Sequence, residues 1–196
     1  LSDEIHCDIT APQEEYIPFA SVSKINQEIS MTCIAPTKAF NIAGLQTSCI
    51  VVPNAVLRHK VNRGINTDEV AEANSFAISA SIAAFQKGRE WLMELRTYIE
   101  HNKQMAVAYI NEHIPELYVV PSKATYLLWV DCSKVCTDSV LLVDYIRKKT
   151  GLYVSDGQEY GENGKQFIRI NVACPYQRMM DGLERLNEGI KSFQRK

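Results

Sequence analysis

Residues 31–52 read MTCIAPTKAFNIAGLQTSCIVV, and this stretch indicates the fold class of the chain more clearly than any other. Met31–Ala35 and Thr47–Val52 are short and are rich in β-branched residues or flanked by proline, which is typical of buried strands. Between them, Pro36–Gly44 combines a proline, small residues and a glycine, which predicts a loop or a short helical turn. We therefore expect the first part of the chain to belong to an α/β domain.

The sequence changes character after Thr67, where a run without proline begins and extends past Glu112. Thr67–Glu69 can cap a helix, so we expect one or two long helices here, with a break at Gly88. Apolar residues recur at steps of three and four and form one stripe: Phe76, Ala80, Ala83, Ala84, Trp91, Leu95, Tyr98 and Ile99. The boundary between the first part of the chain and its tail is expected within these helices, near Arg96–Gln104.

The tail alternates short strands with amphipathic helices. Pro115 and Pro121 bracket a turn and a short strand, and Gly151 is a normal helix stop. Further strands are predicted at Thr125–Asp131, Leu152–Val154 and Phe167–Val172, and helices at Asp138–Lys149 and Tyr176–Phe193. This pattern is typical of a small α+β domain.

Composition excludes several classes of protein. The 196 residues are 46% hydrophobic, enough for a packed core, and their net charge of −2 gives no attraction to nucleic acid. The longest apolar stretches are far shorter than the roughly 20 residues that cross a bilayer, and Leu1–His6 does not resemble a secretory signal. Six dispersed cysteines suit a reducing cytoplasm, and Cys132 and Cys136 lack the second pair that a zinc site requires. We expect a cytoplasmic protein without metal, membrane segment or nucleic-acid partner.

Lys38 is the first candidate for chemistry, because it lies in an apolar segment where a charged amine is costly to desolvate. A buried lysine has a lowered pKa, and its unprotonated amine can attack an aldehyde to form a Schiff base. The alternative is an ordinary solvated loop lysine, which the residues alone favour.

Two further candidates lie near the ends of the chain. Asp3 and His6 would follow the end of a strand if the residues upstream were apolar; there an Asp could hold a protonated ring nitrogen and a His could donate to a ring oxygen. A plain polar loop is the alternative. Arg169 interrupts an alternating apolar strand and shares a face with Asn171. Its guanidinium requires a carboxylate, supplied either by a structural acid or by a substrate.

Taken together, these sites resemble one family, the fold-type I pyridoxal-phosphate (PLP) enzymes of the class I/II aminotransferase superfamily. Ser2–Asp8 is similar to the family segment whose Asp, here Asp3, binds the pyridine nitrogen. His6 stands where many aminotransferases carry a Tyr, and a His there is more typical of the carbon–sulfur lyase branch. Ala35–Gln46 resembles the Schiff-base lysine segment of that branch, with Lys38 as the lysine. Phe167–Asn171 is similar to the strand that binds the substrate carboxylate, with Arg169 and Asn171 as binding residues.

The resemblance implies a PLP-dependent β-lyase similar to cystathionine β-lyase, which converts a cysteine thioether to a thiol, pyruvate and ammonia. Lys38 would hold PLP and act as general base, and Thr37 would contribute a hydroxyl to the phosphate. At Gln46 many aminotransferases have an Arg, and a neutral amide contacts phosphate more weakly. A class I/II aminotransferase shares all three sites and is the first alternative.

Family members are about twice as long and act as homodimers, so the resemblance implies that this chain is the C-terminal portion of such an enzyme. Residues 1–75 would be the remainder of the PLP-binding large domain, residues 76–104 long connecting helices, and residues 105–196 a small α+β domain. A catalytically inert fragment is therefore the second alternative.

Overall fold

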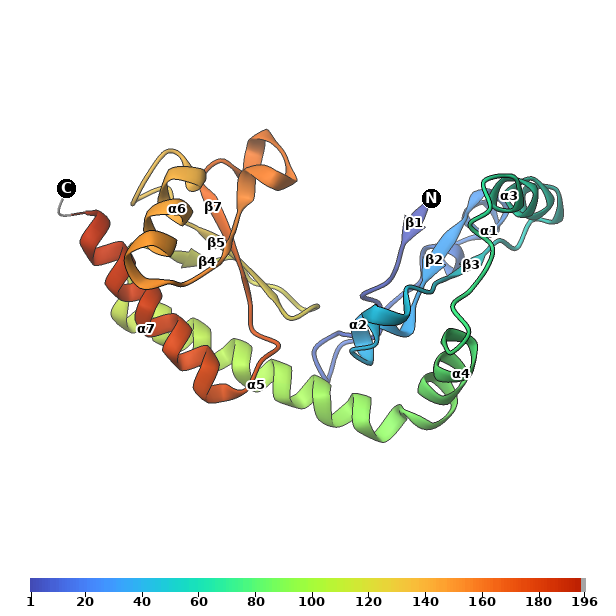
Figure 1. The fold of residues 1–196 in the computed structure, drawn as a ribbon, viewed down its shortest axis with the longest axis horizontal. Helices are drawn as coiled ribbons and strands as arrows, with labels where there is room; N and C mark the ends of the chain where they lie inside the picture. Colours follow the sequence, from blue (N-terminus) through green and yellow to red (C-terminus); the bar gives the residue numbers. More distant parts are fainter. Residues whose placement is uncertain (195–196) are drawn as a thin grey trace. The chain divides into compact units, whose positions relative to one another are not determined.

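The computed structural model describes residues 1–194, a mixed α/β chain drawn in Figure 1. The chain divides into two compact units, Leu1–Arg96 and Thr97–Lys196, and each is described by itself. None of the helices in the described residues is both long and apolar enough to span a membrane.

The first unit contains a three-stranded sheet of β1 (Ser2–Asp3), β2 (Thr32–Ile34) and β3 (Cys49–Val51), in the order β1-β2-β3. β1 and β2 are parallel, whereas β2 and β3 are antiparallel. Two short helices, α2 (Pro36–Ala39) and η2 (Ala43–Leu45), connect β2 to β3, which confirms the predicted strand, turn and strand. The expected burial of the second strand is wrong. All three residues of the edge strand β3 are exposed, and burial begins only at Val52, which directly follows the strand.

The first unit also contains η1 (Phe19–Ser21), α1 (Lys24–Ile29) and α3 (Ala55–Thr67). The expectation that Thr67–Glu69 begins a helix is wrong, because α3 ends at Thr67. The true start of α3 lies at Asn54, whose side-chain oxygen accepts a hydrogen bond from the N–H of Leu57 at 2.9 Å. An Asn at this position satisfies an N–H that the helix itself leaves without a partner.

Gly88 separates α4 (Ala77–Lys87) from α5 (Arg89–His113), at the predicted break. A Cβ atom at Gly88 would collide with the ring of Phe40 and the carbonyl oxygen of Ala84, so the glycine permits a close approach. Phe40 contacts Phe85 edge to face, with ring centroids 6.2 Å apart, and stacks on Trp91 at 5.7 Å. These contacts join α2 to α4 and to the start of α5.

The second unit contains a four-stranded antiparallel sheet in the order β4-β5-β7-β6. Its strands are β4 (Tyr118–Val119), β5 (Leu127–Asp131), β6 (Ser155–Asp156) and β7 (Phe167–Asn171). Two short helices, η3 (Gly157–Tyr160) and η4 (Glu162–Gly164), connect β6 to β7. The predicted strand at Leu152–Val154 is wrong, because Val154 is buried in the core and the residues paired with β7 are Ser155 and Asp156.

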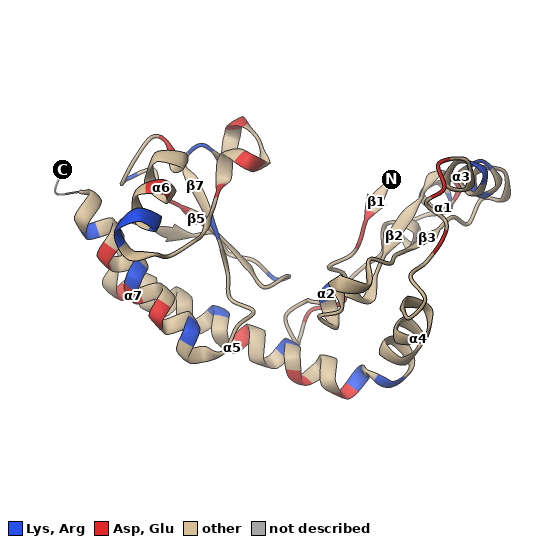
Figure 2. Ribbon diagram, viewed as in Figure 1, with Lys and Arg blue, Asp and Glu red and all other residues tan. Residues whose placement is uncertain are grey.

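Three helices complete the second unit: the C-terminal part of α5, α6 (Ser139–Thr150) and α7 (Tyr176–Phe193). Asp138 caps α6 by accepting from the N–H of Val140 at 2.9 Å, and Gly151 ends it in the left-handed conformation. Fully buried aliphatic side chains form the core: Ile110, Leu128, Val130, Leu142, Ile146, Ile168, Leu183, Leu186 and Ile190. Basic and acidic residues are interspersed along α7 (Figure 2), between the apolar residues that the helix buries.

Candidate functional site

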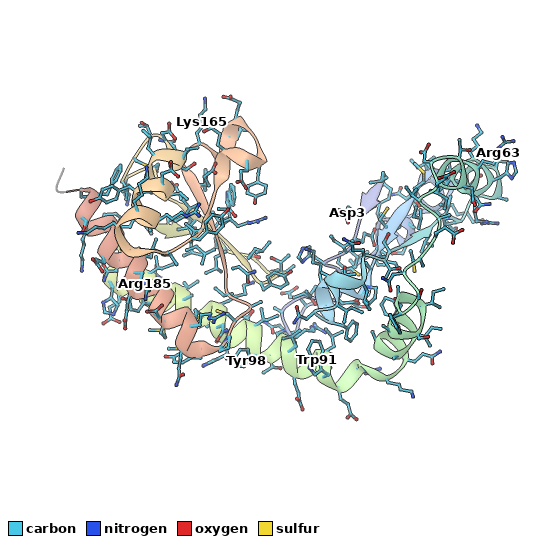
Figure 3. All side chains as sticks on the ribbon, in the orientation of Figure 1. Asp3, Arg63, Trp91, Tyr98, Lys165 and Arg185 are labelled. Carbon is cyan, nitrogen blue, oxygen red and sulfur yellow. The ribbon has the colours of Figure 1, made fainter. Side chains whose placement is uncertain are left out.

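The first unit brings a carboxylate and a primary amine to one edge of its sheet. Because β1 and β2 run parallel, with Asp3 opposite Cys33, their carboxyl ends meet at the same edge. Asp3 is the last residue of β1, and Lys38 follows Ile34, the last residue of β2, on the helix α2. Both side chains are exposed, and Asp3 is labelled in Figure 3. Ligands of α/β proteins bind outside the carboxyl ends of the strands.

The short helix α2 fixes the backbone of Lys38. Pro36 is its first residue, where the proline ring presets φ and the missing N–H has no cost. Pro36 and Ala39 are buried, whereas Lys38 is exposed. The apolar segment therefore anchors the helix while the amine faces solvent. Lys38 is therefore solvated in this structure, which is the alternative that the residues alone favour, and is not buried as the catalytic interpretation supposed.

Glu4, next to Asp3, is a buried acid that the sequence did not single out. It is 4% exposed, and its carboxylate accepts hydrogen bonds from the hydroxyl of Ser2 at 2.8 Å and from the N–H of Phe19 at 3.0 Å. Burial, together with the charge and hydrogen bond of Glu4, raises the pKa of Tyr16 to about 12. Glu4 thus ties the segment at residues 16–19 to the end of β1 and stabilises the backbone of Asp3.

Arg96 holds the next loop, at Thr10 and Ala11, through side-chain hydrogen bonds. Its guanidinium donates to the carbonyl oxygens of Thr10 at 2.9 Å and Ala11 at 2.8 Å, and to the hydroxyl of Thr10 at 2.8 Å. Burial raises the pKa of Asp8, and the positive charge of Arg96 partly opposes this shift. No sequence signal reveals the contact, because Arg96 and Thr10 are 86 residues apart.

The other predicted cofactor residues also belong to the first unit. His6 is partly buried in the turn after β1, and Thr37 is partly buried on α2 beside Lys38. Gln46 is exposed and ends η2 in the left-handed conformation, with φ of 50°. The unit therefore contains all five residues proposed to bind the cofactor: Asp3, His6, Thr37, Lys38 and Gln46.

The second unit contains Arg169, at the centre of β7, where it pairs with Trp129 on β5 and Ser155 on β6. The guanidinium carbon lies 4.5 Å from the centre of the Tyr160 ring, and Nη2 donates to the hydroxyl of Ser155 at 3.5 Å. Within residues 1–194 no carboxylate forms a salt bridge with Arg169. The alternative of an internal ion pair therefore finds no support among the described residues.

Asn171 follows Arg169 by two residues on the same strand and is exposed. Its side-chain oxygen accepts a hydrogen bond from the N–H of Ala173 at 2.8 Å, and this bond does not use the side-chain NH2 group. Tyr126 is close enough for the charge of Arg169 to lower its pKa, although burial has the larger effect and raises it. The second unit thus presents a cation and an amide on one strand face.

These groups fit a cofactor that carries an aldehyde and a protonated ring nitrogen. A primary amine can add to the aldehyde, and a carboxylate can accept a hydrogen bond from the ring nitrogen. The guanidinium on the second unit has the fork geometry that binds a carboxylate. In the part of the chain that the structure describes, no cluster of His, Cys, Asp or Glu could hold a metal ion.

Known proteins resemble this chain over nearly its whole length, although no family model matches it. Cystathionine beta-lyase PatB of Bacillus subtilis is 37% identical over 190 residues, which are 97% of this chain and 49% of PatB. LL-diaminopimelate aminotransferase of Gloeobacter violaceus is 26% identical over 161 residues, 82% of this chain and 40% of the relative. The chain spans about half the length of the curated relatives that it matches.

Two solved structures share the fold. Cystalysin of Treponema denticola, which contains a pyridoxal 5'-phosphate cofactor, is 27% identical with a TM-score of 0.93, covering 97% of this chain and 48% of cystalysin. The PLP-bound C-S lyase of Staphylococcus hominis, complexed with L-cycloserine, is 31% identical with a TM-score of 0.86, covering 96% of this chain and 46% of the lyase.

Proposed function

This chain is a homologue of cystathionine β-lyases and C–S lyases with the PLP-dependent aminotransferase fold, and we propose that it carries the lysine and the arginine of a carbon–sulfur β-lyase. The observation that supports this most is the parallel pairing of β1 and β2, because it brings Asp3 and Lys38 to one sheet edge. The substrate would be a cysteine thioether such as cystathionine, and the products a thiol, pyruvate and ammonia.

Each residue would have a separate task. Lys38 would hold PLP through its Nζ atom and would accept the α-proton of the substrate as general base. Asp3 would accept a hydrogen bond from the ring nitrogen and keep it protonated. Bound PLP supplies an electron-poor ring that stabilises negative charge at the α-carbon. Arg169 would bind the α-carboxylate and so orient the bond that breaks.

The other predicted residues complete the proposed site. We propose that His6 donates to the ring oxygen, that Thr37 and Gln46 contact the phosphate, and that Asn171 assists Arg169. We also propose that residues 1–75 belong to the cofactor domain, residues 76–104 are connecting helices, and residues 105–196 form the small domain. A homodimer in the cytoplasm is the assembly and location that we propose for the whole protein.

The test is release of pyruvate from cystathionine by protein expressed from the complete gene in the presence of PLP. We expect Lys38→Ala to abolish release, because the base and the attachment point are lost together. The matched control is Lys24→Ala, an exposed lysine of the same unit, which should retain wild-type activity. Absence of pyruvate with the wild-type protein, or normal release by Lys38→Ala, would contradict the proposal.

An aminotransferase is the second candidate, supported by the similarity to LL-diaminopimelate aminotransferase. It would use the same Lys38, Asp3 and Arg169. Addition of a 2-oxo acid separates the two reactions, because it accelerates turnover by an aminotransferase and leaves a β-lyase unaffected. We expect no acceleration.

A further inference from the structure

We infer that Tyr160 is a positioning residue for Arg169 and determines how tightly the site binds the carboxylate of an amino acid. This inference rests on the proposed role of Arg169 as the carboxylate-binding residue. Tyr160 lies on a different segment from Arg169 and would affect carboxylate binding only through the position of the guanidinium.

The contact is a cation over an aromatic face. The guanidinium carbon of Arg169 lies 4.5 Å from the centre of the Tyr160 ring, well inside the range of an attractive cation–π contact. Tyr160 also meets Trp129 edge to face, with ring centroids 5.8 Å apart, and Trp129 stacks on Phe167 at 5.3 Å. Trp129 pairs with Arg169 across β5 and β7. Tyr160 therefore lies on Arg169 and is itself held by the aromatic residue opposite.

The backbone around Tyr160 is closely constrained. Gly157 and Gly164 are buried and approach each other so closely that a Cβ atom on either would collide with the carbonyl oxygen of the other. Gly161 has φ of 124°, which L side chains rarely adopt, and its carbonyl oxygen accepts from the N–H of Gly164 at 2.8 Å. The loop at residues 157–164 thus holds Tyr160 at a fixed place over β7.

This geometry leaves the binding edge of Arg169 available. A contact between the guanidinium carbon and an aromatic ring uses none of the N–H donors of Arg169 in a hydrogen bond. The single hydrogen bond to Ser155, at 3.5 Å, is long. Tyr160 therefore limits the rotation of Arg169 without competing for the carboxylate, and only its ring is needed for this effect.

The test compares Tyr160→Leu, which removes the ring, with Tyr160→Phe, which retains it. The matched control is Tyr153→Leu, because Tyr153 forms a similar contact with Arg147, at 5.2 Å, on another part of the unit. In PLP-loaded protein from the complete gene, we expect Tyr160→Leu to raise KM for cystathionine several-fold, up to about tenfold, with kcat changed less than about twofold. Tyr160→Phe and Tyr153→Leu should match wild type.

A binding measurement tests the carboxylate itself. 2-Aminoisobutyrate has an amine and a carboxylate but no α-proton, and tert-butylamine is its analogue without the carboxylate. Titration followed by absorbance gives Kd for each. We expect Tyr160→Leu to raise the Kd of 2-aminoisobutyrate several-fold and to leave the Kd of tert-butylamine unchanged.

The outcomes separate the two proposals. Suppose that wild type binds both amines through Lys38. If Tyr160→Leu then leaves the Kd of 2-aminoisobutyrate unchanged, or raises the Kd of both amines equally, the positioning role is overturned while the proposed function stands. If wild-type protein binds neither amine, the proposed function fails and the inference falls with it.

Discussion

Lys38 illustrates how the surroundings of one residue determine what its side chain can do. Its neighbours Pro36 and Ala39 are buried and Phe40 is stacked, so the backbone is fixed while the amine is exposed. An exposed amine can be reached by an aldehyde, which suits the proposed attachment of PLP. Next to Asp3, Glu4 is buried and accepts hydrogen bonds from Ser2 and Phe19, and the guanidinium of Arg169 contacts the ring of Tyr160.

Cys132 and Cys136 provide a prediction at this scale. The thiol of Cys132 is fully buried and donates a hydrogen bond to the carbonyl oxygen of Gln166 at 3.0 Å, and its interaction with Cys136 lowers the pKa of Cys136 below the usual thiol value. The same interaction with Cys136, together with burial, raises the pKa of Cys132. We expect iodoacetamide to modify Cys136 before Cys132, because Cys136 is less buried and its pKa is lowered whereas that of Cys132 is raised.

Mass spectrometry of peptides after timed alkylation measures this order. Cys132→Ala removes this interaction and should shift the rate profile of Cys136 to higher pH. Cys49, which is exposed, reports on the reagent in every sample. Equal rates for Cys132 and Cys136 in the folded protein would contradict the prediction.

Lys103 gives a second prediction, on stability. It is 7% exposed, its Nζ donates to the carbonyl oxygen of Ser122 at 2.8 Å, and burial lowers its pKa below the usual 10.5. Between the lowered pKa and 10.5 the unfolded chain binds more protons than the folded chain, so the contribution of Lys103 to stability rises with pH.

We expect wild type to gain stability relative to Lys103→Met as pH rises toward 10.5. Urea unfolding of both proteins across this range measures the difference in free energy of unfolding. A difference that does not change with pH would show that burial does not affect the ammonium.

At the scale of elements, the two glycines Gly64 and Gly88 should respond oppositely to alanine. A Cβ at Gly64, inside α3, meets nothing within 4 Å, so Gly64→Ala should stabilise the protein by about 0.5–1 kcal/mol. A Cβ at Gly88 meets Phe40 and Ala84, so Gly88→Ala should destabilise it by about 1–3 kcal/mol. Thermal unfolding measures the change in stability of both variants. A loss of stability in Gly64→Ala would contradict the open space found around Gly64 in α3.

Some elements were predictable from the sequence and others were not, for physical reasons. The closing helix was predicted with the bounds that α7 has, Tyr176–Phe193, because Pro175 precedes it and five of its residues are buried on one side. The helix α3 was missed, although Asn54 caps it and Leu57, Val61 and Ile65 form an apolar stripe at four-residue steps. β6 was placed a few residues early because Val154 is apolar and buried without joining the sheet.

At the scale of the whole molecule, the proposed chemistry is divided between two units. Asp3 and Lys38 lie in the first unit, and Arg169 lies in the second. The sequence identified these residues because they stand in recognisable local segments. Glu4, Arg96 and Tyr160 were not identified, because their partners are distant in the chain and burial depends on the tertiary structure.

The proposed function depends most on the statement that Lys38 binds PLP. Reduction of the PLP-treated protein with borohydride makes this link permanent, and mass spectrometry of the digest locates it. We predict one labelled peptide, containing Lys38, which disappears in Lys38→Ala and persists in Lys24→Ala. A label on another lysine, with Lys38 unmodified, would contradict the proposal.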